Sequence, residues 1–231
     1  MKKIVVLTGA GISAESGIQT FRDADGLWEN HNIEDVATPE GYRRNPSLVL
    51  RFYNERRQKL NEVEPNAGHK ALVELEKKYK VSIVTQNVDD LHERAGSTSI
   101  WHLHGELRKA RSSRNPNLVY DCNGDINLGD KAEDGSQLRP AIVWFGEDVP
   151  LIQNAAALVS EASVIIVVGS SMQVYPAAGL VSYAHGQVRI YYVDPKPALN
   201  HELKLRKNLH IIAEPATTGV WKVVNELMNE I

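Results

Sequence analysis

The sequence predicts an α/β fold, in which a parallel sheet carries helices on both faces and a small second domain is built from two insertions. Three observations in the 231 residues support this prediction. Short apolar runs alternate with helix-like segments over most of the chain, the first run passes directly into a glycine-rich turn, and the alternation is interrupted twice. Strands that alternate with helices are typical of a parallel sheet, because each connecting helix covers one of its faces.

The first apolar run, residues 3–8, has the length and composition of a strand that is buried on both faces of a parallel sheet. Further strand-like runs follow at residues 81–85, 99–102, 141–144, 164–168, 189–193 and 209–212. Helix-like segments lie between them at residues 66–79, 151–161, 177–185 and 217–228. We therefore expect one doubly wound sheet, and the chain shows no internal repeat.

The alternation breaks at residues 29–65, which are polar, helix-leaning, punctuated by three prolines and free of strand-like runs. It breaks again at residues 107–139, where Ser, Asn, Asp and Gly are frequent. We predict that both stretches are insertions that together form the small domain. The large domain then consists of residues 1–28, 66–106 and 140–231.

The composition predicts a globular protein of the cytoplasm. An apolar fraction of 42% and a charged fraction of 24% are ordinary for globular domains. The net charge of −3 argues against a nucleic-acid or anionic-membrane partner. The single cysteine, Cys122, excludes an internal disulfide framework and suits a reducing compartment. Neither a signal-peptide pattern after Met1 nor an apolar run of membrane-spanning length is found, so we expect a cytoplasmic location.

A glycine-rich motif follows the first strand-like run. The letters GAGISA at residues 9–14 fit the G-x-G-x-x-G/A fingerprint of dinucleotide-binding sites. The first glycine permits a tight turn and the second lets backbone N–H groups approach a pyrophosphate. The small third residue lets a helix begin close to the strand, with its positive end toward the anion. The pattern also fits an ordinary strand-to-helix turn, so alone it leaves both interpretations open.

The residues after this motif argue against a hydride-transfer dehydrogenase. Such enzymes place an acidic residue at the end of the second strand, about 20 residues past the glycines, where it binds the adenosine ribose. Here that region is residues 27–31, which is not a strand end. The next strand ends in TQNVD at residues 85–89, and an acidic residue follows a later strand at Asp194. The sequence favours a protein that binds NAD and contacts the nicotinamide ribose with polar groups.

Several separated motifs occur in the order and spacing that they have in sirtuins. They are GAGIS at 9–13 with its continuation through GI at 17–18 and FR at 21–22, TQNVD at 85–89, LHG at 103–105, VWFGE at 143–147 and GSS at 169–171. The chain thus resembles the sirtuins, NAD-dependent protein-lysine deacylases, over nearly its whole length. The resemblance implies a Rossmann-type domain plus a small domain made of two insertions.

The resemblance also implies how NAD is bound and cut. The pyrophosphate would lie on the glycine turn, and the loop 16–28 would close over the cofactor, with Phe21 screening the reacting carbon and Arg22 holding the loop. Asn87 and Asp89 would hold the nicotinamide and its ribose. The acyl-lysine oxygen attacks the carbon that nicotinamide leaves, and His104 acts as general base through the ribose hydroxyls. Imidazole suits this role because its ordinary pKa of ~6.5 is close to working pH.

Several of these residues also fit a purely structural role. A lone histidine is more often structural, and His104 is preferred as catalytic because LHG ends a strand beside the expected cofactor site. His102, two residues earlier and expected on the same face, is given no role. Asp194 before Pro195 also fits a plain turn, although a carboxylate can accept from ribose hydroxyls where most sirtuins have an Asn.

The predicted site residues fall into three groups. The catalytic residues are Arg22, Asn87, Asp89 and His104. The cofactor-binding residues are Gly9, Ala10, Gly11, Ser13, Glu15, Gly17, Phe21, Arg22, Trp28, Gln86, Asn87, Val88, Asp89, Gly169, Ser170, Ser171, Asp194, Pro195, Lys196 and Ala216. The substrate-binding residues are Tyr53, Arg56, Val143, Phe145, Gly146, Glu147 and Val174. The substrate peptide would add as a strand between residues 143–147 and 169–175.

Two departures from the common sirtuin pattern predict a subtype. Most sirtuins carry a Cys-x-x-Cys pair twice in the second insertion, but here Ser112 stands roughly where a cysteine would and Cys122 is the only thiol. We expect no zinc, so that residues 107–139 fold by their own packing. The second departure is the Tyr53-x-x-Arg56 spacing, which resembles class III sirtuins that remove malonyl, succinyl or glutaryl groups. Small residues near Ala37 would leave room for the longer acyl chain.

Tyr53 and Arg56 are i, i+3 neighbours on a helix, and a guanidinium with a phenol can bind a carboxylate. A solvated basic helix face is the alternative. We therefore expect an acidic-acyl deacylase with some deacetylase activity, acting on acylated proteins as a monomer. Two other functions stay open, namely ADP-ribosyl transfer to protein and a non-catalytic sensor of NAD or acyl-lysine. Formation of NADH would instead identify a dehydrogenase.

Overall fold

The computed structural model describes residues 1–20, 27–28 and 31–230 of the chain. The large domain is built on a six-stranded sheet in the order β11-β10-β9-β1-β4-β5, and every neighbouring pair is parallel. These strands are β1 (Lys3–Thr8), β4 (Lys80–Thr85), β5 (Ile100–His102), β9 (Val164–Val168), β10 (Arg189–Val193) and β11 (Leu209–Ile212). The predicted doubly wound parallel sheet is therefore confirmed.

The strand order reverses at β1. From β1 the chain builds outward through β4 and β5 on one side, then returns to β9 and builds outward through β10 and β11 on the other. In open α/β sheets, a ligand site forms at the carboxyl ends of the strands where the order reverses. The glycine motif follows β1 at this position.

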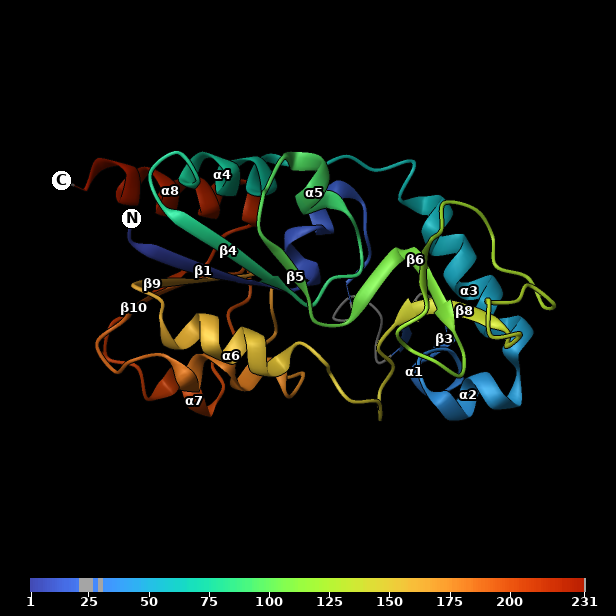
Figure 1. The fold of residues 1–231 in the computed structure, drawn as a ribbon. Coiled ribbons are helices and arrows are strands. Elements are labelled where there is room, and N and C mark those ends of the chain that lie inside the picture. Colours follow the sequence, from blue (N-terminus) through green and yellow to red (C-terminus); the bar gives the residue numbers. More distant parts are fainter. Residues whose placement is uncertain (21–26, 29–30, 231) are drawn as a thin grey trace.

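Helices cover both faces of the sheet (Figure 1). Alternate residues of β1 point to opposite faces, as a strand period of two requires. Ile4 and Val6 pack in one core with α4 (Ala67–Leu75) and α8 (Ala216–Asn229). Val5 and Leu7 pack in a second core with three further helices. These are α6 (Ile152–Ser160), the 3₁₀ segment η4 (Ala177–Tyr183) and α7 (His201–Lys204).

The small domain combines the two insertions (Figure 1). The first supplies helices α1 (Ile33–Val36), α2 (Pro39–Arg44) and α3 (Pro46–Lys59), together with the short pair β2 (Leu27–Trp28) and β3 (His31–Asn32). The second supplies a three-stranded antiparallel sheet of β6 (Gly105–Ser112), β7 (Val119–Asp121) and β8 (Leu138–Ile142). Helix α5 (Leu91–Ala95) lies between β4 and β5 in the chain.

Three expectations about single elements are wrong. The run 141–144 is not a strand of the parallel sheet, because β8 returns from the second insertion and pairs antiparallel with β6. The segment 29–65 contains a two-residue strand, β3. No α-helix begins at the glycine motif, which continues instead as two 3₁₀ turns, η1 (Ala10–Ile12) and η2 (Ala14–Ser16). Three-residue turns carry little helix dipole.

Hydrogen bonds of the Ser112 hydroxyl join the end of β6 to other residues of the second insertion. The Ser112 hydroxyl lies 2.7 Å from both Asp134 Oδ2 and Ser136 Oγ. It also accepts from the backbone N–H groups of Arg114 and Asn115, at 3.0 and 2.8 Å. Ser112, which stands roughly where the resemblance implies a cysteine, is thus buried and joined by hydrogen bonds to four neighbouring residues. Among the described residues, no group of three or more His, Cys, Asp or Glu side chains is arranged to hold a metal ion.

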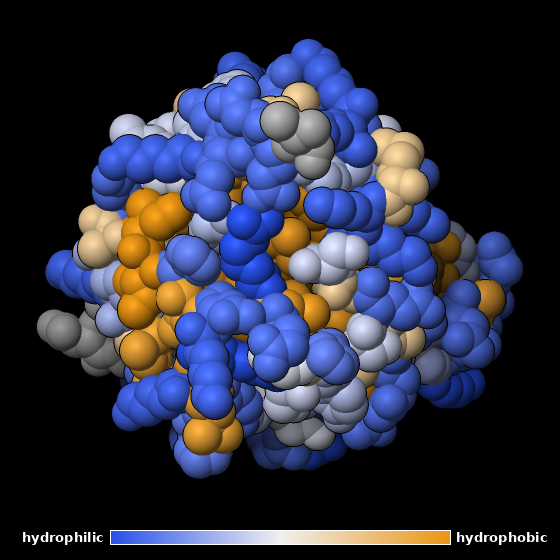
Figure 2. All heavy atoms as spheres, turned by 90° about the vertical axis from the view of Figure 1, so that its left-hand side faces the viewer, coloured by the Kyte–Doolittle hydropathy of each residue, from blue (hydrophilic) through white to orange (hydrophobic). Residues whose placement is uncertain are grey.

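The face at the amino ends of the strands, turned away from the small domain, is mainly hydrophilic with smaller hydrophobic areas (Figure 2). None of the helices in the described part of the chain has the length and apolar character needed to span a membrane.

Candidate functional site

A cavity of about 440 Å³ lies between the carboxyl ends of the central strands and the small domain. Its wall includes these predicted cofactor residues: Gly9, Ala10, Gly11, Trp28, Gln86, Asn87, Val88, Asp89, Gly169, Ser170, Ser171, Asp194, Pro195 and Lys196. It also includes His104 and the predicted substrate residues Tyr53, Val143, Phe145, Gly146, Glu147 and Val174. The remaining predicted residues that the structure describes, Ser13, Glu15, Gly17, Arg56 and Ala216, do not line it. Phe21 and Arg22 lie outside the described residues.

The glycine turn packs directly against the turn that follows β9. The Gly9 N–H donates to the Val168 carbonyl at 3.0 Å, and the Gly11 N–H donates to the Gly169 carbonyl at 2.8 Å. Gly169 adopts a φ of +60°, and a Cβ atom on Gly11 would come within 2.6 Å of its Cα. Only glycines allow this approach of the two backbones. The two turns thus form one continuous floor of the cavity.

Ser13 lies behind the cavity wall and connects two predicted catalytic side chains. Its hydroxyl donates to Asp89 Oδ2 at 3.0 Å, and Asn87 Nδ2 donates to the Ser13 oxygen at 3.2 Å. Asp89 Oδ1 accepts from the Leu91 N–H at 3.1 Å. Burial raises the pKa of Asp89 to about 6, although the hydrogen bonds from Leu91 and Ser13 oppose the shift. Ser13 therefore fixes Asn87 and Asp89 without lining the cavity itself.

His104 is presented to the cavity as a neutral base. Its Nδ1 lies 3.1 Å from the Gln86 carbonyl oxygen. Because a carbonyl only accepts, Nδ1 carries the ring proton and Nε2 keeps a lone pair. Burial lowers the pKa of His104, with the Gln86 hydrogen bond opposing it. His104 follows β5 in the turn to β6, just beyond the strand end where the sequence placed it.

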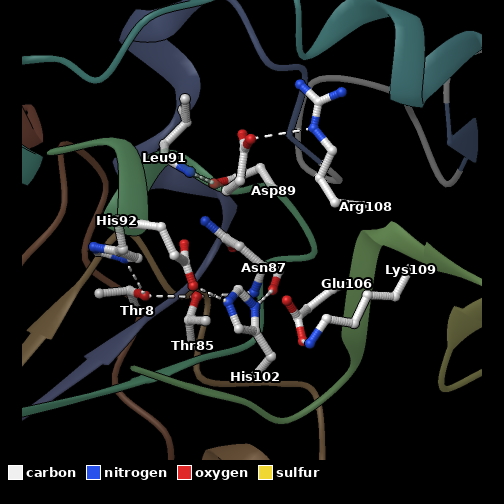
Figure 3. A network of polar contacts seen from close by, with 12 residues as sticks. Thr8, Thr85, Asn87, Asp89, Leu91, His92, His102, Glu106, Arg108 and Lys109 are labelled. Atoms are coloured by element: carbon white, nitrogen blue, oxygen red, sulfur yellow. Dashed lines mark hydrogen bonds and ion pairs between the residues drawn. The ribbon is translucent and has the colours of Figure 1, made fainter. Parts of the chain in front are cut away.

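His102 supports the site from behind (Figure 3). Its Nδ1 lies 3.0 Å from the Asn87 carbonyl oxygen and its Nε2 lies 2.7 Å from a Glu93 carboxylate oxygen. Burial lowers the pKa of His102, but the hydrogen bond and charge of Glu93 outweigh it, so the net shift is upward. His102 does not line the cavity. It contacts the backbone carbonyl of Asn87, whereas Ser13 contacts the Asn87 side chain.

The adenosine end of the predicted site is held by side-chain to backbone contacts. Asp194 is 3% exposed, and its carboxylate accepts from the Lys196 N–H at 2.8 Å. Glu15 accepts from the N–H and hydroxyl of Thr217, at 3.0 and 2.7 Å, in the first turn of α8. Ala216, the first residue of α8, is buried beside it. Glu15 and Ala216 thus position α8 against the glycine motif rather than form the cavity wall.

At the small-domain end of the cavity, Tyr53 lines the wall and Arg56 does not. Tyr53 is fully buried, lines the cavity, and its hydroxyl accepts from the Trp144 indole N–H at 3.0 Å. The Arg56 guanidinium lies 3.2 Å from the Phe52 ring centroid and 5.3 Å from that of Trp28, and it donates to the Phe52 carbonyl. Arg56 thus lies behind the cavity wall and contacts the ring of Trp28, which lines the cavity.

The segment Val143–Glu147 forms one side of the cavity mouth. The Val143 N–H donates to the His104 carbonyl at 2.9 Å, and the Phe145 ring is 45% exposed. Glu147 lines the cavity, but its carboxylate accepts from Arg139, Arg111 and the Trp144 N–H. The Glu147 side chain therefore holds the segment in place.

Sequence reasoning did not single out Trp144 and Tyr175, both of which line the cavity. Each lies inside a segment assigned to the peptide, and the motif VWFGE already contained Trp144. The Trp144 side chain points inward to Tyr53. Strand addition to a peptide uses backbone groups, so that prediction gave the Trp144 side chain no role.

The chain is similar to known proteins along most of its length. The model of the Sir2 family matches residues 9–176. An "NAD-dependent protein deacylase" of Helicobacter pylori is 58% identical over 228 residues, which cover 99% of this chain and 98% of the relative. A Sir2 homologue solved in complex with NAD superposes with a TM-score of 0.87 at 37% identity, over 98% of this chain and 90% of that one.

A Sir2 mutant solved with a p53 peptide and NAD superposes with a TM-score of 0.78 at 30% identity, over 98% of this chain and 94% of that one. Both the sequence matches and the superpositions extend over the large and the small domain. The glycine turn, the segment Gln86–Asp89, His104 and the segment Val143–Glu147 all fall inside the matched range. As its motifs predict, the chain belongs to the Sir2 family.

Proposed function

We propose that this chain is an NAD-dependent protein-lysine deacylase that removes succinyl and malonyl groups and also acetyl groups. The observation that carries the proposal is one cavity that joins the glycine turn, the neutral His104 and the buried hydroxyl of Tyr53. A dinucleotide site, a base and an acyl-binding recess therefore lie within reach of one another. The deacylase name of the Helicobacter relative supports the same activity.

NAD enters the reaction as a substrate and is consumed. The glycine floor would receive its pyrophosphate, because Gly9, Gly11 and Gly169 leave no side chain between backbone and ligand. The Asp194 carboxylate would accept from the adenosine ribose hydroxyls. Asn87 and Asp89 would hold the nicotinamide end, while the loop roles of Phe21 and Arg22 stay predictions.

The reaction would proceed at the ribose carbon that bears nicotinamide. The carbonyl oxygen of the acyl-lysine forms a bond to this carbon as the bond to nicotinamide breaks. His104 Nε2 then accepts a proton that is relayed through the ribose hydroxyls, so that the 2′ oxygen attacks the imidate carbon. Water hydrolyses the cyclic adduct to lysine and 2′-O-acyl-ADP-ribose. A lowered pKa keeps His104 in the required neutral form at neutral pH.

The acyl preference is supported by positive charge around the Tyr53 hydroxyl. Burial raises the pKa of Tyr53, whereas the Trp144 hydrogen bond and the charges of Arg139 and Arg56 act in the opposite direction. The carboxylate of Glu147, which is paired with Arg139, adds to the rise. Both guanidinium groups therefore reach this hydroxyl electrostatically. A terminal carboxylate beside it would be stabilised, and the small Ala37 side chain in the same wall would leave room for the acyl chain.

The test is a panel of acetyl-, malonyl- and succinyl-lysine peptides with and without NAD, followed by mass spectrometry. Arg56→Met should lower kcat/KM for succinyl-lysine by at least roughly tenfold and leave acetyl-lysine nearly unchanged, because only the acidic acyl group uses the charge. Arg51→Met is the matched control, since Arg51 lies on the same helix, is exposed and does not line this cavity.

Equal losses on both substrates in Arg56→Met would contradict the acidic-acyl preference. His104→Tyr should abolish all NAD-dependent products. Label from adenine-labelled NAD that ends on protein, rather than on free acyl-ADP-ribose, would instead identify an ADP-ribosyltransferase. We expect a monomer to be active, and a single cysteine suits the reducing cytoplasm.

A further inference from the structure

Trp144 is a buried residue of the cavity that the reaction described above does not use. It is 2% exposed and lies two residues after the end of β8. Its indole N–H points to the hydroxyl of Tyr53, with 3.0 Å between Nε1 and the phenol oxygen. The two side chains come from segments far apart in the chain, since Tyr53 lies on α3 in the first insertion and Trp144 follows the second.

The chemistry of this pair fixes the direction of the Tyr53 proton. An indole N–H can only donate, so the Tyr53 oxygen is the acceptor. Within the described part of the chain, Trp144 is the only hydrogen-bond partner of this hydroxyl. The O–H proton of Tyr53 is therefore directed away from Trp144, and Tyr53 lines the cavity. Burial also raises the pKa of Tyr53, so the phenol keeps this proton throughout the working pH range.

Trp144 is itself held from two directions. The Arg139 guanidinium lies 3.2 Å from the centroid of the indole ring, and the Tyr42 ring lies 5.1 Å from it. Its backbone N–H donates to Glu147 Oε2 at 2.8 Å, and the same carboxylate binds Arg139 through two guanidinium nitrogens. The indole therefore has little freedom to turn its N–H away from Tyr53.

We propose that Trp144 is a positioning residue for acyl specificity, which orients the Tyr53 hydroxyl so that its proton is donated to the terminal carboxylate of the acyl chain. An acetyl group has no acceptor at this depth, so the oriented proton favours acidic acyl groups only. This inference rests on the acidic-acyl preference proposed above. It assigns to Trp144 a role that acts wholly through Tyr53.

The test is a double-mutant cycle of Trp144→Phe and Tyr53→Phe, measured on succinyl- and acetyl-lysine peptides. Trp144→Phe keeps an aromatic ring under Arg139 but removes the donor. We expect kcat/KM for succinyl-lysine to fall roughly tenfold, mainly through KM, and acetyl-lysine to change less than about threefold. The double variant should lose no more than Tyr53→Phe alone, because Trp144 acts through that hydroxyl.

A second replacement separates the N–H from the volume of the ring. Benzothienylalanine at position 144 has the shape of tryptophan with sulfur in place of the N–H, and it should reproduce the Trp144→Phe result even if the phenylalanine variant folds poorly. Equal losses on both substrates, or additive losses in the double variant, would overturn the role of Trp144. A wild-type enzyme that does not turn over acidic acyl-lysines would overturn the acyl preference and this inference together.

Discussion

The side chain of Asp89 is buried at this site, where its charged form is disfavoured. Its two oxygens accept from Ser13 and from the Leu91 N–H, yet burial still raises its pKa to about 6. His69, 3.4 Å from the Ser13 hydroxyl, is shifted the other way, because burial lowers its pKa to about 4. Burial of the Asp89 carboxyl therefore costs stability near neutral pH, whereas burial of His69 costs stability only at acidic pH.

Asp89→Asn should reveal this cost as a pH-dependent change in stability. A raised native pKa means that the wild type loses stability as the pH rises from about 4, where the unfolded carboxyl ionises, to about 6. Asn does not titrate, so the free energy of unfolding of the variant relative to wild type should increase over this window by up to about 3 kcal/mol. Urea denaturation of both proteins between pH 4 and 8 measures this difference. A difference that is constant with pH would show that Asp89 has an ordinary pKa.

At the scale of elements, the site depends on the contact between the turns after β1 and β9. A Cβ atom on Gly169 would lie 2.2 Å from the Ile12 nitrogen and 2.4 Å from the Gly11 carbonyl carbon. Its φ of +60° also disfavours any residue with a side chain. These backbone atoms cannot give way without separating β1 from β9, whose register is parallel from Ile4 to Thr8.

Gly169→Ala should therefore destabilise the protein by about 2–4 kcal/mol and weaken NAD binding. Gly186→Ala is the matched control, because no atom lies within 4 Å of a Cβ at Gly186 and its φ is not positive. That change should stay within about 0.5 kcal/mol. Thermal unfolding gives the stabilities, and calorimetric titration gives the NAD affinities. An alanine at position 169 that leaves both quantities unchanged would show that the two turns can separate freely.

The elements that sequence could predict are those whose pattern depends only on burial. Residues 164–168 are all buried, so an unbroken apolar run was sufficient to identify β9. The run 141–144 has a similar composition, but it pairs with β6 and not with the parallel sheet. The partner of a strand cannot be identified from the sequence of that strand alone. Likewise, i, i+3 spacing placed Tyr53 and Arg56 on one helix face, but the rings of Phe52 and Trp28 decide that only Tyr53 reaches the cavity.

At the scale of the whole molecule, the two domains supply different halves of the site. The strand ends of the large domain carry the glycine floor, Asn87 and Asp89, while α3 and the segment after β8 carry Tyr53 and Trp144. The end of the cavity at Tyr53 and Trp144 therefore depends on how these two segments are held together. The sequence predicted that these insertions form one unit, but it gave no sign of the contact that joins them.

One of the contacts that join the insertions is made by Arg57, which is 1% exposed on α3. Its Nε donates to the Leu107 carbonyl of β6 at 2.7 Å, and one terminal nitrogen donates to Asn54 Oδ1 at 2.8 Å and to the Gly124 carbonyl at 3.2 Å. Asn54 in turn exchanges two hydrogen bonds of 3.0 Å with the backbone of Ile126. Helix α3 is thus bound to the second insertion by side chain to backbone bonds.

Arg57→Met should open this joint, because it leaves the Leu107 and Gly124 carbonyls buried without their donor. We expect a loss of about 3 kcal/mol in unfolding free energy and faster proteolysis within residues 113–136. Turnover of succinyl- and acetyl-lysine should fall together, since the recess moves as a whole, in contrast to the selective effect expected at Arg56. Arg43→Met is the control, because Arg43 is exposed and pairs with Glu40 at the surface. Selective loss of one substrate in Arg57→Met would place Arg57 in acyl recognition instead of in the joint.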